Sequence, residues 1–416
     1  MGNHINFSEL KVETDPENYG TTEISAYSAK ISHDKRGRSA LEIAADELGF
    51  NGREDIDEQY QEKLEEKVGD FLEKLAKAGH TSTFYQSNEG LNYQVPRHTT
   101  MFLCQFDYPK YLQQSQRYTK AEEFITELED NKDVKEIYER AHRFYNKMIS
   151  DEGTKIRKED ARYILPLGTA AKHIHQNLNF VSLANIYREI EKEDSRIPSI
   201  SKKAVDEGLK ALNHEEPVVF NKKLIDIYNE NDKGYTVTNM FSETNKAIEN
   251  LINGEKNKVL SFCADVDFQS NEYKESFLNL SNYGQMNPSV TGFLTSMSLS
   301  AWHQFMRNDA VKQSVQSIYD AADKGEMFVP ESIVESEYIK EFEKLFDDSM
   351  NLYSKLREDE GDDAIELVPH ALGIDVAFSI DYFNFKRGFI ADRKHGGAQW
   401  EIREIAKQVD QKIRHY

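Results

Sequence analysis

The sequence has few cysteines and no long apolar run. Its 416 residues include two cysteines, Cys104 and Cys263, which form neither a CxxC pair nor a zinc-type spacing with histidine. We therefore expect no disulfide framework, but free buried thiols in a reducing compartment. No stretch approaches the roughly 18 apolar residues of a membrane-spanning helix, and no apolar leader opens the chain. These absences predict a cytoplasmic protein that does not enter a membrane.

Positive charge is also scarce. The chain carries 52 lysines and arginines against 73 aspartates and glutamates, which gives a net charge of −21. Such a field repels polyanions, so we expect no nucleic-acid polymer as a partner. A small phosphorylated ligand stays compatible with this charge, because a few arginines in a pocket reverse the potential locally. The histidines show no metal-type arrangement, and we expect no metal.

The spacing of apolar residues predicts an α+β fold. One clear helical stripe consists of Val134, Ile137, Tyr138, Ala141, Phe144, Tyr145 and Met148. Further helices are expected at 38–49, 57–78, 157–190, 309–323, 333–357 and 398–413, with a buried helix within 297–305. Aromatic and β-branched residues predict strands at 83–95 and 259–268. Each half of the chain would thus pack helices on a small mixed or antiparallel sheet.

The order of these segments repeats along the chain. Ser115 precedes Pro166 as Ser317 precedes Pro369, and 317 − 115 and 369 − 166 give offsets of 202 and 203. A nearly constant offset of this size indicates an internal duplication. We predict an N-terminal repeat at 1–213, a charged, irregular linker at 214–255 and a C-terminal repeat at 256–416.

Hydrogen-bond donors are concentrated between residues 94 and 118, where the sequence reads QVPRHTTMFLCQFDYPKYLQQSQRY. Two arginines, a histidine and several glutamines in so short a stretch suit the oxygens of a phosphate. On composition alone, a solvated loop with ordinary salt bridges explains the segment about equally well.

This segment resembles the signature of the flavin-dependent thymidylate synthases, in which Arg-His-Arg is followed by Ser-x-Arg-Tyr. Arg97-His98 and Ser115-Gln116-Arg117-Tyr118 stand at its two ends, with Thr99 in place of the second arginine and extra residues between the ends. Four further segments are similar to the family in the same order: AKIS at 29–32, AGHTSTF at 78–84, ARYILPLG at 161–168 and DRKHGGAQWEIREIA at 392–406. The last of these is the most specific match.

The two ends of the family pattern fall in different halves of this chain. The signature lies in the first half and the closing AQWEI run in the second, which has only Arg307 and Gln316-Ser317 where a second signature would stand. Because the family assembles its active site between the subunits of a homotetramer, the resemblance implies one complete site between the two repeats. It also implies a homodimer that imitates the tetramer.

The resemblance further implies conversion of dUMP to dTMP, with methylenetetrahydrofolate as the carbon donor, FAD as the flavin and NADPH as the reductant. It assigns catalytic roles to Arg393, Arg117 and Ser115, and dUMP binding to Gln94, Arg97, Gln113, Gln116 and Arg162. It assigns FAD binding to Ser32, His80, Ser82, His98 and Asn179. Cys104 has no neighbouring base in the sequence and is not expected to be a nucleophile. Two alternatives remain open at this stage: a related flavin and folate enzyme that hydroxymethylates a pyrimidine nucleotide, and a catalytically silent nucleotide-binding homologue.

Overall fold

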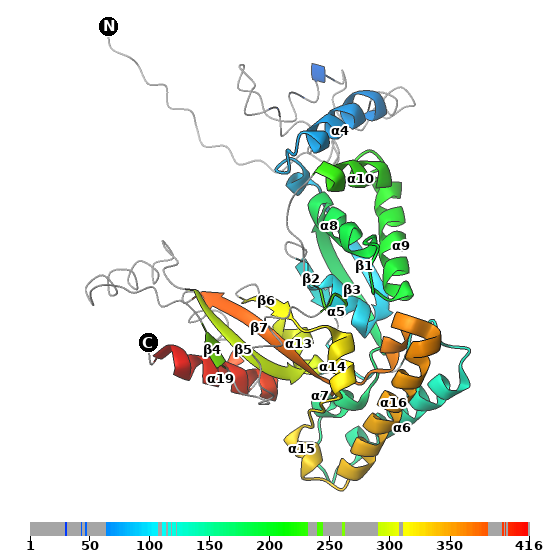
Figure 1. Ribbon diagram of the computed structural model, residues 1–416, viewed down its shortest axis with the longest axis vertical. Coiled ribbons are helices and arrows are strands. Elements are labelled where there is room, and N and C mark those ends of the chain that lie inside the picture. Colours follow the sequence, from blue (N-terminus) through cyan, green and yellow to red (C-terminus); the bar gives the residue numbers. More distant parts are fainter. Residues whose placement is uncertain are drawn as a thin grey trace, which may run out of the picture. The chain divides into compact units, whose positions relative to one another are not determined.

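The computed structural model describes residues 30, 43, 46–47, 64–106, 110–113, 115–117, 119–121, 123–231, 239–243, 260–262, 290–307, 311–381, 393–394, 396 and 398–414. Contacts divide the chain into two units. The small unit comprises Met1–Gly90, Asn177–Ala184 and Gly208–Gly234, and the large unit comprises Leu91–Gln176, Asn185–Glu207 and Tyr235–Tyr416. The helices and two small sheets found in these ranges confirm the expected α+β class (Figure 1). No helix in the described ranges combines the length and apolar character that crossing a membrane requires.

The small unit is held together by helices and an aromatic cluster. Its elements include η2 (Leu64–Gly69), α4 (Asp70–Lys77), η3 (Phe84–Gln86) and α10 (Lys222–Asn231). The rings of Phe84, Phe180 and Tyr228 lie 4.8 to 5.5 Å apart between centroids, a separation typical of packed aromatic pairs. The helix expected at 57–78 is thus confirmed over 64–77.

Helix α10 falls within the segment 214–255, which was expected to be irregular. That expectation is wrong for residues 222–231, because Leu224, Ile225 and Tyr228 form a buried face on one side of this helix. Helix α10 packs on α4 within the small unit. Within α10 the charged residues lie away from this buried face.

The two small sheets share one order of three strands, and the second sheet has a fourth strand at its edge. The first contains β1 (Asn88–Pro96), β3 (Ala170–Asn179) and β2 (Lys110–Gln113) in the order β1-β3-β2. The second contains β4 (Leu260–Phe262), β5 (Val290–Ser298), β7 (Gly373–Asp381) and β6 (Val311–Val315) in the order β4-β5-β7-β6. Its pairs are antiparallel, with Ser298 opposite Gly373 and Val315 opposite Val376. Apart from the added β4, β5-β7-β6 repeats β1-β3-β2.

The remaining helices lie between and after these strands along the chain. They are α5 (Arg97–Leu103), α6 (Lys132–Ser150), α7 (Lys158–Ala161), η4 (Arg162–Ile164), α8 (Phe180–Ile190), α9 (Ser199–Glu215), α13 (Leu299–Phe305), α14 (Ile318–Lys324), α15 (Glu331–Val334), α16 (Ile339–Glu360), η5 (Gly361–Leu367) and α19 (Trp400–Arg414). In the large unit α13 packs on β5, β7 and α19, and α6 lies beside α16 (Figure 1).

The longest predicted stripe is confirmed. All seven of its apolar side chains are buried on α6, and Asn131 caps this helix by accepting from the backbone N–H groups of Asp133 (3.0 Å) and Val134 (3.3 Å). The expected helix at 398–413 is confirmed as α19, and the buried helix within 297–305 as α13. For these segments the helical spacing of apolar residues therefore predicts the structure correctly.

Two predicted helices are wrong in part, because each contains a strand. The segment 157–190 includes β3, in which buried Ile174, Gln176 and Leu178 alternate with exposed neighbours. The segment 309–323 begins with the edge strand β6, which pairs with β7 before α14 starts. In both places the pairing of distant strands overrides the local helical spacing.

Equivalent elements of the two halves confirm the predicted duplication. Strands β1 and β5 have nine residues each and helices α5 and α13 have seven each, and both pairs are offset by 202. Strands β3 and β7 begin 203 residues apart. The repeat is thus one of structure as well as of sequence spacing.

The two halves meet in the large unit around Pro166 and Pro369, which form an antiparallel bridge. Four backbone hydrogen bonds flank the bridge: Leu167 N to Val368 O (2.9 Å), His370 N to Leu165 O (3.0 Å), Gly168 N to Glu366 O (2.8 Å) and Ala371 N to Tyr163 O (2.8 Å). With the offset of 203, the second bond is the first with the repeats exchanged, and the fourth is the third exchanged. This reciprocity is the pattern of a two-fold axis, here within one chain.

Candidate functional site

Arg97 and Gln116 join the two ends of the signature segment. Arg97 is the first residue of α5, and its side chain is buried, with 3% exposed. Its Nε donates to Gln116 Oε1 at 3.0 Å, and Gln116 Nε2 donates to the carbonyl of Ala170 at 3.2 Å. The glutamine is thereby fixed to strand β3, and the arginine is oriented by the glutamine.

Two further arginines of the first repeat share Glu159. The Nε of Arg117 donates to Glu159 Oε2 at 2.7 Å, and the Nε of Arg162 donates to the backbone carbonyl of Glu159 at 3.3 Å. Arg162 is 6% exposed, and its buried Nη2 makes no hydrogen bond to any described residue. A buried guanidinium donor without an acceptor suits an anionic ligand atom.

The second repeat adds Arg307, which sequence reasoning did not select as a site residue. This side chain follows α13, and its Nη1 lies 3.5 Å from Gln113 Oε1 as a donor. The available signal was its position, where a second signature would stand. We call Arg97, Arg117, Arg162 and Arg307 the arginine cluster.

The members of the arginine cluster act on one another electrostatically. Burial lowers the pKa of Arg97 well below its ordinary value, and the charges of Arg162 and Arg307 lower it further. Burial also lowers the pKa of Arg162, with Arg117 and Arg307 acting in the same direction. Assembling like charges in a poorly hydrated place is unfavourable unless an anion joins them.

The closing run of the second repeat contacts this region through Glu401. Its carboxylate is 1% exposed and accepts from Tyr163 Oη (3.0 Å) and Ser298 Oγ (2.8 Å), while Gln399 Nε2 donates to Tyr163 Oη. Burial raises the pKa of Glu401 to about 7, opposed by these hydrogen bonds and by the charge of Arg162. The structure therefore brings the AQWEI run of one repeat to the residue beside Arg162 of the other.

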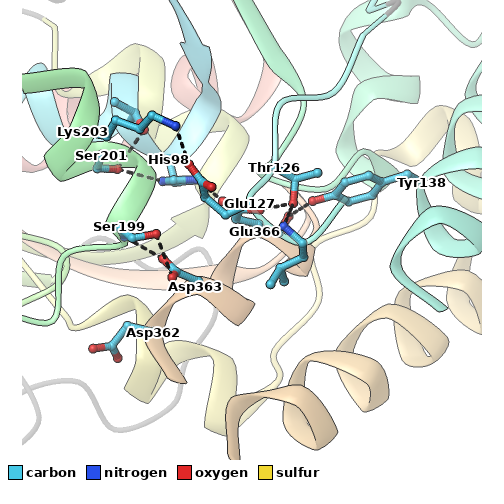
Figure 2. A network of polar contacts seen from close by, with 12 residues as sticks. His98, Thr126, Glu127, Tyr138, Ser199, Ser201, Lys203, Asp362, Asp363 and Glu366 are labelled. Atoms are coloured by element: carbon cyan, nitrogen blue, oxygen red, sulfur yellow. Dashed lines mark hydrogen bonds and ion pairs between the residues drawn. The ribbon is translucent and has the colours of Figure 1, made fainter. Parts of the chain in front are cut away.

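His98 faces a buried polar network (Figure 2), which Thr99 joins through Ser201. His98 is fully buried, with Nδ1 3.2 Å from Ser201 Oγ and Nε2 3.7 Å from Glu366 Oε1. The Oγ1 of Thr99 lies 2.8 Å from the same Ser201 oxygen, and Thr126 Oγ1 donates to Glu366 Oε2. These two signature positions thus link α5 to α9 and to the second repeat.

Other expected nucleotide residues lie nearer the surface of the large unit. Gln94 is exposed and its Nε2 donates to Glu123 Oε2 at 3.2 Å, while Ser115 Oγ accepts from the backbone N–H of Arg117 at 3.3 Å. Arg393 is partly buried just before Lys394, which forms an ion pair with Asp410. The assignment of Arg393 to the site remains a prediction.

The other expected flavin residues lie in the small unit or outside the described residues. His80 and Ser82 are exposed in the loop after α4. The side-chain oxygen of Asn179 accepts from Ser182 N (2.9 Å) and Ser182 Oγ (3.0 Å) and so caps α8. Ser32 lies outside the described residues.

Three buried titratable groups near the arginine cluster are neutral at physiological pH. Burial raises the pKa of Cys104 to about 11, so its thiol stays protonated and unreactive. Burial lowers the pKa of His370 to about 3 and that of His303 well below its ordinary value, and arginine charges strengthen both shifts. Among the described residues, no group of three His, Cys, Asp or Glu side chains is arranged to hold a metal ion.

Comparison with known proteins gives the same family twice. The family model described as "Thymidylate synthase complementing protein" matches residues 18–195 and again residues 237–416. A flavin-dependent thymidylate synthase from Clostridium tetani (strain Massachusetts / E88) is 30% identical over 159 residues, which cover 32% of this chain and 62% of the relative. The chain thus spans less than two thirds of that relative's length. We conclude that the chain belongs to the thymidylate synthase complementing protein family and carries its domain in two tandem copies.

Proposed function

We propose that the protein is a flavin-dependent thymidylate synthase with FAD as its flavin. It would convert dUMP to dTMP, with a one-carbon unit from methylenetetrahydrofolate and NADPH as the reductant. The observation that carries the proposal is the arginine cluster, four cations gathered from both repeats in a chain of net charge −21. Such a local reversal of potential suits a nucleotide monophosphate.

In this proposal the phosphate binds to guanidinium groups that the protein has already oriented. Gln116 fixes Arg97, and Glu159 fixes both Arg117 and Arg162, so little side-chain freedom is lost when dUMP binds. The Nη2 of Arg162 supplies a donor that the described residues leave unused. This pre-organisation of the binding groups also favours catalysis, because the reacting ring is held in one position.

Polarisation of the uracil ring is the second task of the protein. By family resemblance we assign it to Arg393, whose cation would stabilise negative charge on the pyrimidine carbonyl as C5 becomes nucleophilic. A bound flavin would supply the reducing equivalent. His80 and Ser82 are exposed and able to meet a ligand, whereas Asn179 and His98 are engaged by the protein's own groups.

The engagement of His98 favours one second candidate, a nucleotide-binding homologue without catalysis. Its burial between Ser201 and Glu366, with Thr99 replacing an arginine, removes two ligand contacts that the resemblance implies. This candidate predicts that dUMP binds but flavin does not. A related hydroxymethylase would need the same phosphate clamp and would differ in its product.

A flavin spectrum tests these possibilities. Purified protein is mixed with FAD and then with dUMP, and turnover with NADPH and methylenetetrahydrofolate is followed by product analysis. A bound-flavin spectrum that dUMP perturbs, together with dTMP as product, is the expected result. Binding of dUMP without flavin would favour the silent homologue, and a hydroxymethylated nucleotide would identify the alternative enzyme.

We further propose that two chains associate as a homodimer that imitates the family's tetramer. The reciprocal hydrogen bonds around Pro166 and Pro369 support this, because they place one two-fold contact inside a single chain. Light scattering of the purified protein should give twice the chain mass, and a monomer mass would refute the proposal.

A further inference from the structure

Arg307 lies outside every segment through which the family resemblance assigns the nucleotide site. It belongs to the second repeat and is exposed after the end of α13. Its Nε donates to the carbonyl of His303 at 3.1 Å, and its Nη1 points to Gln113 Oε1 at 3.5 Å. The first contact fixes the guanidinium to its own helix, and the second reaches a residue of the first repeat's signature segment.

The fold itself does not require an arginine at this position. Helices α5 and α13 are equivalent with an offset of 202, so the counterpart of Arg307 is Gln105. The Oε1 of Gln105 accepts from the backbone N–H of Met240 at 2.8 Å, and its Nε2 donates to Met101 O at 3.2 Å. An uncharged amide therefore serves the same place in the first repeat by bonding to backbone.

Arg307 adds its charge to a part of the protein that already holds other cations. Its field lowers the pKa values of Arg97, Arg162 and His303, which places it among like charges. Three described carboxylates act on the cluster: Glu159 is bonded to Arg117, Asp160 interacts with the charge of Arg162, and Glu401 has its pKa raised to about 7 by burial. Positive charge is in excess, and the unused Nη2 of Arg162 points to an anionic ligand as the compensation.

We propose that Arg307 binds the phosphate of the nucleotide as a fourth cation, contributed by the second repeat to the site of the first. The inference rests on the proposed function and names a residue of that same site. It gives the second repeat a direct part in ligand recognition besides the closing run. The recognised chemistry is a phosphate monoester dianion, which a guanidinium binds with two parallel donors.

The test compares dUMP with deoxyuridine, which differs from it by the phosphate. Calorimetric titration of the full chain should show that Arg307→Gln weakens dUMP binding about tenfold, as expected for loss of one charge-assisted contact at a partly exposed site. Deoxyuridine binding should change less than about twofold. Arg307→Lys, which keeps the charge without the planar fork, should fall between the wild type and Arg307→Gln.

The matched control is Arg143→Gln, which removes an exposed arginine of α6 that pairs with Glu139. It should leave both affinities unchanged, so that net charge alone is excluded as the cause. An unchanged dUMP affinity in Arg307→Gln, or an equal loss for dUMP and deoxyuridine, would overturn the inference while leaving the proposed function standing. Failure of the wild type to bind dUMP would overturn both.

Discussion

The two repeats share strand order and helix lengths but differ in the chemistry of equivalent positions. Where the first repeat has a cation of the arginine cluster, the second has a buried uncharged side chain: Arg97 and Leu299, Arg117 and Tyr319, Arg162 and Ile365. The second repeat shows that this fold packs well without the arginines. Their presence in the first repeat is therefore not explained by the needs of folding, which agrees with the nucleotide site that we propose.

Tyr319 occupies in the second repeat the position that Arg117 occupies in the first. The guanidinium of Arg196 stacks 3.9 Å from the centre of its ring, and its hydroxyl donates to the Arg196 carbonyl at 2.6 Å. Its burial raises the pKa well above the ordinary value, so the phenol stays neutral. The position has become a stacking contact within the protein.

The most direct test of this difference replaces Arg97 of the first repeat with leucine, the residue at the equivalent position of the second repeat. Arg97→Leu should weaken dUMP binding by about 30-fold or more, in line with the roughly 2–5 kcal/mol lost when one partner of a buried charged contact is removed. Stability should change little, because the lost bond to Gln116 is offset once a cation is no longer desolvated beside Arg162 and Arg307. Calorimetry and thermal unfolding measure the two effects. Unfolding of the variant would show instead that packing requires the arginine.

The contact of Glu401 with the first repeat can be tested through the pH dependence of the protein's stability. Burial raises the pKa of Glu401 from 4.5 to about 7, so the folded protein binds more protons than the unfolded chain between these values. Stability should therefore fall as pH rises through this window, by an amount on the order of 3 kcal/mol, and level off above it. Glu401→Gln cannot ionise and should lack this decline.

Denaturant unfolding between pH 4 and 8 measures that difference. The exposed Glu404 of the same helix provides the control, since Glu404→Gln should follow the wild-type curve. Parallel curves for the wild type and Glu401→Gln would mean that the carboxylate does not hold a proton in the fold.

A glycine distinguishes the two sides of the internal two-fold. Gly168 has Ala371 as its counterpart, but a Cβ at Gly168 would lie 2.2 Å from Tyr138 Oη and 2.9 Å from its Cζ. Gly168→Ala should thus lower the free energy of unfolding by about 1–3 kcal/mol through overpacking. Removing the hydroxyl with Tyr138→Phe should restore part of this loss. Gly396→Ala, with no atom within 4 Å of the added Cβ, is the neutral control.

The difference between the repeats should also determine how many nucleotides each chain binds. If only the first repeat keeps the cations at the positions of Arg97, Arg117 and Arg162, calorimetric titration should give one dUMP per chain even though the family domain occurs twice. Two equivalents per chain would show that the second repeat binds nucleotide by other means, and the contrast drawn from Leu299, Tyr319 and Ile365 would fail.

Local pattern accounts for much of the fold and for the grouping of part of the site. The stripe of α6 and the face of α19 follow from helical spacing, and the nearly constant offset of 202 to 203 residues indicates the duplication. Arg97, Gln116, Arg117 and Arg162 lie together as the resemblance implied. These features depend on residues close in sequence or on a motif whose members act together.

The remainder depends on contacts across long separations. Strand β3 looked helical because its alternation is short and its pairing partners lie far away in sequence. The burial of His98 is decided by Ser201 and Glu366, which lie 103 and 268 residues further along the chain. The position of Arg307, where a second signature would stand, becomes informative only through its contact with Gln113 of the other repeat. No motif within one repeat encodes any of these.

The antiparallel bridge at Pro166 and Pro369 also has an evolutionary consequence. In a symmetric homodimer every substitution is inherited by both partners at once, so a change that suits one half of the contact is imposed on the other. A fused pair escapes this constraint, since Gly168 and Ala371, or Arg97 and Leu299, are separate codons. One gene can then divide labour between its halves, with each half free to lose what its neighbour retains.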